Sequence, residues 1–356
     1  MEQGGTVSVT SLLALLREAF RCRASDLHLT AGMPPMFRID GCLVSTSLAQ
    51  LTSQEIAALA QEIMTEALWE QYLNQGELDF PYSVPGEGRL RVNAFRQRGG
   101  HALAIRLIAK APPTLEELDM PSIVRELALG TQGLVLVTGP SGSGKSTTLA
   151  GMINEINYTC SSHIITLEEP IEFVHSPNKS IIHQREVGRD TKTYASGLRA
   201  ALRADPDVIL IGEMRDLETI SVAITAAETG HLVLSTLHTK GAARSIDRIV
   251  DVFPPHQQNQ IQLQLSNVLA AIISQELLPR QDGKGRVAAQ EIMIATPAIR
   301  NLIREGKTHQ IDSMIQIGGG YGMITMDQAL ANLYQQGVIT HEQAVAHSNV
   351  PQSISG

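Results

Sequence analysis

The segment from Gly139 to Thr147 carries the residue types that predict chemistry most clearly. It has glycines at 139 and 144, with Lys145 and Ser146 directly after the second one. Such glycines let successive backbone N–H groups converge on a phosphate, while the lysine adds charge and the hydroxyl can ligate Mg²⁺. An apolar run, 134–138, precedes the segment and a helical pattern, 147–156, follows it. We therefore predict that ATP and Mg²⁺ bind here, with the phosphates held by Gly139, Pro140, Ser141, Gly142, Ser143, Gly144, Lys145, Ser146 and Thr147.

A second candidate is the carboxylate of Glu213, which follows the apolar run Val208 to Ile211. Open α/β sheets bind ligands at the carboxyl ends of their strands, so this position favours a role beside the phosphates. The magnesium-binding strand of phosphate-loop enzymes generally ends in aspartate, whereas here Gly212 precedes a glutamate. From the residues alone, Glu213 is either a metal ligand together with Ser146 or an exposed acid at a strand end.

Three carboxylates, Glu168, Glu169 and Glu172, follow another short apolar run, Ile164 to Leu167. Mutual repulsion would raise the pKa of at least one of them toward values that suit a general base. Such a cluster can hold Mg²⁺ or polarise an attacking water. The alternative is a solvated acidic loop.

Two histidines, His231 and His238, lie at opposite ends of the apolar segment between them. A neutral imidazole at such a place can hydrogen-bond a phosphate or the water that attacks it. We expect His238, at the carboxyl end, to be the better candidate, although a lone histidine is usually a surface or core residue.

The elements that must position these groups divide into two parts. In the first third, alternating segments 26–30 and 36–39 predict strands, and Thr52 with Glu55 predicts a capped helix that continues to about Tyr72. Three further strands are predicted over 78–84, 90–95 and 102–108. This pattern is typical of a small α+β domain.

The segment Lys110 to Thr114 contains two prolines and predicts the domain boundary, giving domains 1–110 and 111–356. Beyond it, strands over 134–138, 164–167, 208–211 and 232–235 alternate with helices. Short apolar runs of this kind are typical of a parallel sheet in an α/β domain. From about Asn259 to the end we expect mostly helix.

Composition limits the function classes. A net charge of -8 argues against a general nucleic-acid binder, although it does not exclude a local basic groove. No run approaches the roughly 20 apolar residues that a membrane span needs, and no signal peptide is predicted. The three cysteines, at 22, 42 and 160, have no metal-ligand or redox spacing. We expect a soluble cytoplasmic protein with reduced thiols.

The motifs together resemble the secretion ATPases of type II secretion and type IV pilus systems over nearly the whole chain. The segment 166–172 resembles the Asp box of that family, 202–218 its Walker B segment and 230–239 its His box. The opening segments 24–32 and 34–41 resemble its N-terminal, PAS-like domain. The resemblance implies an α/β fold in which a small α+β, PAS-like domain precedes a RecA-like P-loop ATPase domain with a helical C-terminal part.

The segment Ala298 to Glu305, Ala-Ile-Arg-Asn-Leu-Ile-Arg-Glu, resembles the one that marks the pilus-retraction members of the family. Its apolar residues form one stripe of a helix, with Arg300 and Arg304 on other faces. Glu169 stands where the family usually has Asp, so the catalytic base could be Glu172 or Glu168. Gly212, by contrast, is what the family has before its Walker B glutamate.

The resemblance further implies a homohexameric ring in which the N-terminal domain of one subunit covers the nucleotide of the next. Arg91 and Arg106 match the arginines that reach that nucleotide, with Lys145, the four glutamates and the two histidines as the other catalytic candidates. On sequence alone these arginines could equally face solvent.

The implied activity is ATP hydrolysis that powers pilus retraction through an inner-membrane platform protein, from the inner face of the cytoplasmic membrane, with no nucleic acid bound and no membrane insertion. Alternatives are an accessory retraction ATPase, a pilus-assembly or secretion ATPase, a DNA translocase and a non-catalytic nucleotide switch.

Overall fold

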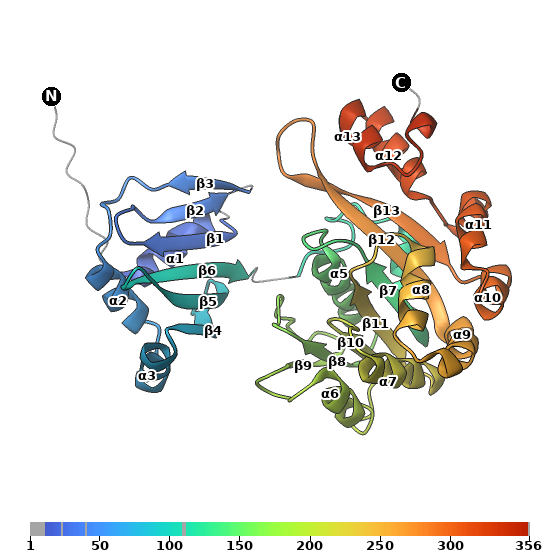
Figure 1. Ribbon diagram of the computed structural model, residues 1–356, viewed down its shortest axis with the longest axis horizontal. Helices are drawn as coiled ribbons and strands as arrows, with labels where there is room; N and C mark the ends of the chain where they lie inside the picture. Colours follow the sequence, from blue (N-terminus) through green and yellow to red (C-terminus); the bar gives the residue numbers. More distant parts are fainter. Residues whose placement is uncertain (1–10, 23, 40, 109–111, 355–356) are drawn as a thin grey trace. The chain divides into compact units, whose positions relative to one another are not determined.

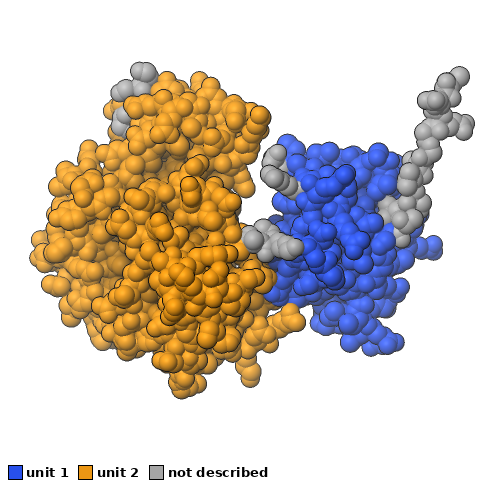
Figure 2. All heavy atoms as spheres, turned by 180° about the vertical axis from the view of Figure 1, so that it is seen from behind, with its two compact units in different colours: residues 1–110 blue, residues 111–356 orange. Residues whose placement is uncertain are grey.

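The computed structural model describes residues 11–22, 24–39, 41–108 and 112–354. The chain divides into two compact units, residues 1–110 and 111–356, which Figure 2 shows in different colours. Lys110 and Ala111, which belong to the predicted linker, lie outside the described residues. Each unit is built around its own sheet (Figure 1).

The first unit has a six-stranded antiparallel sheet in the order β3-β2-β1-β6-β5-β4. Its core gathers apolar side chains from the helices and from alternate strand positions, including the fully buried Leu12, Leu27 and Tyr72. The elements are α1 (Leu12–Arg21), β1 (Asp26–Thr30), β2 (Met36–Ile39), β3 (Cys42–Ser45), α2 (Ser53–Gln61), α3 (Glu66–Gln75), β4 (Glu77–Val84), β5 (Gly88–Gln97) and β6 (Gly100–Ile108).

The helix predicted to continue to about Tyr72 is two helices, so that prediction was wrong. Thr52 and Glu55 form the expected capping box at the start of α2. A second threonine, Thr65, then accepts a hydrogen bond from the backbone N–H of Leu68 and starts α3. A threonine at this position satisfies a backbone donor that a new helix would otherwise leave without a partner, so the helical periodicity is interrupted.

The second unit has a seven-stranded sheet in the order β13-β12-β7-β11-β10-β8-β9. Its strands are parallel except for β13, which pairs antiparallel with β12. The elements are α4 (Ser122–Ala128), β7 (Gly133–Thr138), α5 (Lys145–Thr159), β8 (His163–Glu168), β9 (Ile181–Glu186), α6 (Tyr194–Ala201), β10 (Val208–Ile211), α7 (Leu217–Glu228), β11 (Leu232–Leu237), α8 (Ala242–Asp251), α9 (Pro255–Val268), β12 (Leu269–Pro279), β13 (Arg286–Ile294), α10 (Pro297–Arg304), α11 (Ile311–Ile317), α12 (Met326–Gln335) and α13 (His341–His347).

Both faces of this sheet are covered. Along β7, Leu134 and Leu136 join a core with α7, α8 and α9, whereas Val135 and Val137 join a second core with α4 and α5. All six residues of β7 are buried. Burial on two faces explains why the strand is a continuous apolar run rather than an alternating one.

The prediction of mostly helix after Asn259 was wrong for residues 269–294, which form the long strands β12 and β13 (Figure 1). Ala, Leu, Gln and Glu in this segment are good helix formers, so their local preference favours helix. Pairing with β7 on one side and β13 on the other overrides that preference. The remaining C-terminal part, α10 to α13, is helical as expected.

The parallel strands bring the chemically interesting segments together, because their carboxyl ends meet at one edge of the sheet. The glycine-rich loop follows β7, the acidic loop follows β8, Glu213 follows β10 and His238 follows β11. Among the described residues, no helix is long and apolar enough to cross a membrane.

Candidate active site

The glycine-rich loop connects β7 to the amino end of α5. Gly139 has a φ of 143° and Gly144 a φ of 86°, and both values disfavour any side chain. A Cβ on Gly139 would also collide with the backbone carbonyl oxygen of Gln275. The first N–H groups of α5 have no partner within the helix, and they face the end of the loop where an anion is favoured.

Lys145 is the first residue of α5 and is buried. Its ammonium donates to the carbonyl oxygens of Gly139 (2.9 Å) and Pro140 (3.0 Å). Burial lowers the pKa of Lys145, and the negative charges of Glu213 and Glu172 oppose that shift. The lysine is therefore held by its own loop, beside the carboxylates, at the position where a phosphate would accept its hydrogen bonds.

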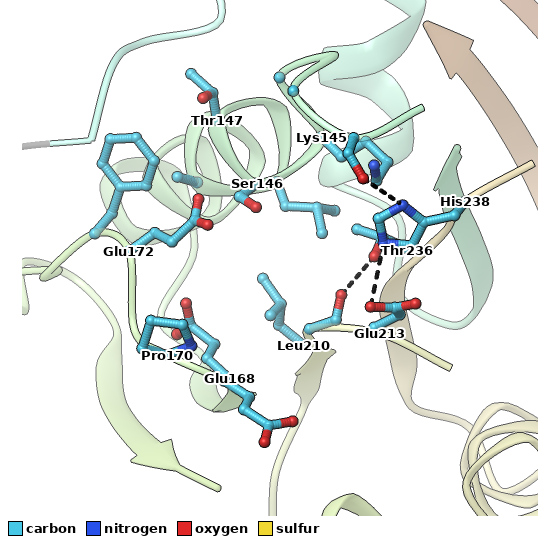
Figure 3. Close-up of a pocket in the computed structure, with 18 of the residues that line it drawn as sticks. Lys145, Ser146, Thr147, Glu168, Pro170, Glu172, Leu210, Glu213, Thr236 and His238 are labelled. Atoms are coloured by element: carbon cyan, nitrogen blue, oxygen red, sulfur yellow. Dashed lines mark hydrogen bonds and ion pairs between the residues drawn. The ribbon is translucent and has the colours of Figure 1, made fainter. Parts of the chain in front are cut away.

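Glu213 is the centre of a charged network, and Figure 3 shows its contact with His238. Its Oε2 atom lies 2.7 Å from Nη2 of Arg215 and 3.2 Å from Nε2 of His238. Burial would raise the pKa of Glu213, but the hydrogen bonds and charges of Arg215 and His238 outweigh burial and lower it. The other ring nitrogen of His238 lies 3.4 Å from the hydroxyl of Ser141, so the histidine bridges the strand-end glutamate and the loop.

The three glutamates after β8 have different surroundings. The carboxylate of Glu168 accepts two hydrogen bonds at its Oε1 atom. The hydroxyl of Thr166 donates one at 2.6 Å and the side-chain amide of Gln184 the other at 3.1 Å. Burial raises the pKa of Glu168 against those hydrogen bonds. Glu169 and Glu172 are exposed and line the same pocket. In Figure 3, Glu172 and His238 lie on opposite sides of Ser146.

These groups surround a pocket of about 440 Å³. It brings together most of the phosphate loop and the predicted catalytic residues of three other loops. Of the predicted phosphate-binding residues, Gly139, Pro140 and the buried Ser143 do not line it. The predicted residues that line it are Ser141, Gly142, Gly144, Lys145, Ser146, Thr147, Glu168, Glu169, Glu172, Glu213 and His238.

Three of the predicted catalytic residues lie elsewhere. His231 precedes β11, at the opposite end of that strand from His238, and hydrogen-bonds the carbonyl oxygen of Ala226 instead of lining the pocket. Arg91 and Arg106 belong to the first unit, where they face each other across β5 and β6. Arg106 donates to Asp26 at 3.1 Å, and both arginine side chains are largely exposed.

Several residues of the pocket were missed by sequence reasoning. Arg215, two residues after Glu213, balances that carboxylate, and its proximity in sequence was an available signal. Tyr194 and His175 also line the pocket. Burial, with the charges of Glu169 and Glu213, strongly raises the pKa of Tyr194, whereas burial lowers that of His175 to about 4. Nothing in the sequence distinguished these two residues, because their relevance depends on how the chain folds around the pocket.

The residues present fit a nucleotide with its metal ion. The loop leaves no room for side chains at Gly139, and Lys145 provides a buried cation. The hydroxyl of Ser146 and the carboxylate of Glu213 line the same pocket. Mg²⁺ is usually bound by one or two protein oxygens together with substrate phosphates, which matches this donor set.

Comparison with known proteins agrees with this geometry. The family model described as type II/IV secretion system protein matches residues 2–292. The chain belongs to the type II/IV secretion ATPase family. It is 49% identical to the type IV pilus retraction ATPase PilT of Pseudomonas aeruginosa, over 98% of this chain and 100% of that protein. It is also 49% identical to a twitching motility protein of Neisseria gonorrhoeae, over 97% of this chain and 92% of the relative.

Among solved structures, the chain is similar to a crystal structure of the pilus retraction motor PilT with bound ADP. The TM-score is 0.89 at 50% identity, covering 97% of this chain and 98% of the other. Three predictions are confirmed: the family, the RecA-like ATPase fold with a preceding N-terminal domain, and the assignment as an ATPase. Binding of a nucleotide is likewise supported by these relatives.

Proposed function

We propose that this chain is the ATP-hydrolysing motor of type IV pilus retraction. The observation that carries the proposal is the convergence of the phosphate loop, Glu213, His238 and the acidic loop on one pocket. Identity of 49% over the whole length of a pilus retraction ATPase supports the biological role. The segment 298–305, predicted to mark retraction members, forms helix α10 as expected.

In this proposal the loop and the amino end of α5 hold the phosphates, with Lys145 exchanging its contacts on Gly139 and Pro140 for phosphate oxygens. Ser146 and Glu213 hold Mg²⁺. The bound Mg²⁺–ATP supplies the phosphoryl group and the metal charge that offsets its oxygens. The chain itself orients these groups around the phosphates.

We assign activation of the attacking water to Glu172. Its carboxylate is exposed within the pocket, and its side chain has no ion pair among the described residues. Glu168 is already engaged by Thr166 and Gln184, which leaves it poorly placed to accept a proton from water. A general base must reach the proton that it abstracts, so access decides between them.

His238 has a different role, because it contacts both the loop and Glu213. We propose that it responds to the nucleotide state and passes the difference to the rest of the protein. Arg91 and Arg106 would complete the site from a neighbouring subunit of a homohexamer, neutralising charge that develops during phosphoryl transfer. His231 has no part in the pocket of its own subunit.

The partner in this proposal is an inner-membrane platform protein, and the motor works at the inner face of the cytoplasmic membrane. ATP binding and hydrolysis would move the two units relative to each other and so drive pilus disassembly. Support comes from the relatives' role in pilus retraction and twitching motility.

A deletion strain tests the biological role. Surface pili that accumulate without twitching are expected, and complementation should restore movement. Bald cells would instead indicate an assembly ATPase, and normal pili with twitching would contradict a role as the main retraction motor.

The biochemical test is Lys145→Ala in the purified protein. Loss of the ammonium should reduce ATP turnover by at least about 100-fold, because phosphate binding and charge stabilisation both depend on it. Thermal unfolding without nucleotide controls for folding. Full turnover in a folded variant would contradict the assignment of the site, and stimulation of turnover by DNA would favour a translocase.

A further inference from the structure

We propose that Gln275 is a positioning residue of the ATP site, which holds the phosphate loop in its binding conformation from outside the pocket. The inference rests on the proposed function of the loop. Gln275 lies on β12, is only 1% exposed and does not line the pocket. Its effect on nucleotide must therefore pass through the residues that it contacts.

Both ends of the Gln275 amide are used. Nε2 donates to the backbone carbonyl oxygen of Ser143, at 2.5 Å. Oε1 accepts from the hydroxyl of Thr148, at 2.9 Å. All three residues are buried, with exposures of 1 to 3%, so water cannot replace either hydrogen bond. An amide supplies a donor and an acceptor at these two places without a charge at any pH, whereas a carboxyl does so only when it is protonated.

The hydrogen bond to Ser143 has a direct consequence for phosphate binding. In a trans peptide the C=O of one residue and the N–H of the next point in opposite directions. Holding the Ser143 carbonyl toward β12 therefore turns the N–H of Gly144 away from β12. Gly144 lines the pocket, and its N–H is among those that the loop offers to an anion.

The hydrogen bond from Thr148 connects the same amide to the first turn of α5. One side chain thus spans the last part of the loop and the amino end of the helix. If the loop shifted relative to the helix, one of the two hydrogen bonds would break. The N–H groups of the loop and the amino end of α5 are thereby held in positions from which both can contact the same phosphate.

The two glycines of the motif lie close to strand β12, on which Gln275 is located. A Cβ on Gly139 would collide with the carbonyl oxygen of Gln275. A Cβ on Gly144 would lie 2.8 Å from Cδ1 of Leu277 and 3.2 Å from Nε2 of Gln275, both on β12. Both glycines therefore pack against β12, which leaves little space for a side chain on that side of the loop.

The key test compares Gln275→Glu with Gln275→Leu in the full-length protein. An ionised glutamate keeps an acceptor for Thr148 but faces the Ser143 carbonyl without a donor. Burial favours its protonated form as the pH falls, and a protonated carboxyl can donate to that carbonyl again. Leucine cannot donate at any pH.

The dissociation constant for ADP is measured by calorimetry from pH 8 to pH 6, always relative to the unchanged protein. We expect both variants to bind at least about tenfold more weakly at pH 8, and Gln275→Glu alone to recover toward the reference at pH 6. Thermal unfolding without nucleotide identifies any variant that is not folded. Thr148→Val, which removes only the second hydrogen bond at nearly constant shape, gives a milder loss of affinity and remains usable if the others fail to fold.

Affinities within about twofold of the reference in folded variants would overturn the positioning role. So would equal losses for glutamate and leucine at every pH, since that result indicates packing alone. If the unchanged protein bound no ADP, the proposed function would fail instead, and the two failures are thereby distinguishable.

Discussion

At the residue scale, the four carboxylates of the pocket are not equivalent. Glu213 is paired with Arg215 and His238, Glu168 is half-buried and hydrogen-bonded, and Glu169 and Glu172 are exposed. We therefore expect these similar residue types to have different tasks, because their surroundings differ. Single substitutions can separate these tasks.

We expect Glu172→Gln to lower kcat by at least about 100-fold while ADP binding is retained, because general-base catalysis typically contributes that much. Glu168→Gln keeps an acceptor for Thr166 and should lower kcat by less than about tenfold. Steady-state ATPase assays and ADP titrations measure both effects. A larger loss of kcat in Glu168→Gln than in Glu172→Gln would reverse the assignment.

His175 predicts an acid sensitivity of the second unit. Burial lowers its pKa from 6.5 to about 4, and its Nδ1 atom is buried without a hydrogen-bond partner among the described residues. Between these pH values the unfolded chain binds a proton that the folded chain does not, so stability falls as the pH falls. Above about pH 6.5 His175 does not lower the free energy of unfolding. As the pH falls from 6.5 toward 4, the free energy of unfolding decreases by up to about 3 kcal/mol because of this residue.

The matched variant is His175→Leu, which has no titrating group. Urea unfolding of the second unit between pH 7 and pH 4.5 should show that the unchanged protein loses more stability than the variant. Parallel stability curves for the two proteins would argue against a buried neutral histidine.

At the element scale, helix α10 gives its two arginines separate roles. The guanidinium of Arg300 donates to the carbonyl oxygens of Ser266 (2.7 Å) and Asn267 (2.6 Å), in the last turn of α9, and to Ala295 (2.9 Å). Carbonyls in the last turn of a helix have no partner within it. Arg304, by contrast, is exposed.

We therefore expect Arg300→Ala to lower the free energy of unfolding by about 2 kcal/mol, the range for hydrogen bonds to a charged group. Arg304→Ala, in the same segment, should change it by less than about 0.5 kcal/mol. Chemical denaturation of both variants compares them. Equal stabilities would mean that the contacts of Arg300 contribute little in solution.

The elements that carry the loop, Glu213 and His238 could be predicted from sequence, because strands buried on both faces are short runs such as Val208 to Ile211. Strand β12 could not, since its own residues favour helix and only pairing with β7 makes it a strand. Gln275 was missed for that reason. The contact of His238 with Glu213 joins two loops that spacing along the chain does not bring together, whereas Arg215 lies only two residues after Glu213.

At the scale of the whole molecule, each unit has its own hydrophobic core. The pocket residues all belong to the second unit, whereas Arg91 and Arg106 belong to the first. We expect residues 112–354 alone to bind ADP with an affinity within about tenfold of the full chain. Their ATP turnover should fall by at least about 100-fold, because the arginines are missing.

Calorimetry and ATPase assays check this expectation. They compare the shortened protein with the full chain and with full-length variants that carry Arg91→Ala and Arg106→Ala. Undiminished turnover without the first unit would show that neither arginine contributes.

The edge strand β3 has a consequence for experiments in which the first unit is prepared without the second. It lies at the end of its sheet, where among the described residues it pairs with β2 alone, and it exposes Leu43 and Val44 at 52% and 44%. An exposed apolar edge offers its outer backbone groups as a template for another strand. The first unit, prepared by itself at high concentration, is therefore expected to aggregate through this edge, and solubility rather than folding would limit its study.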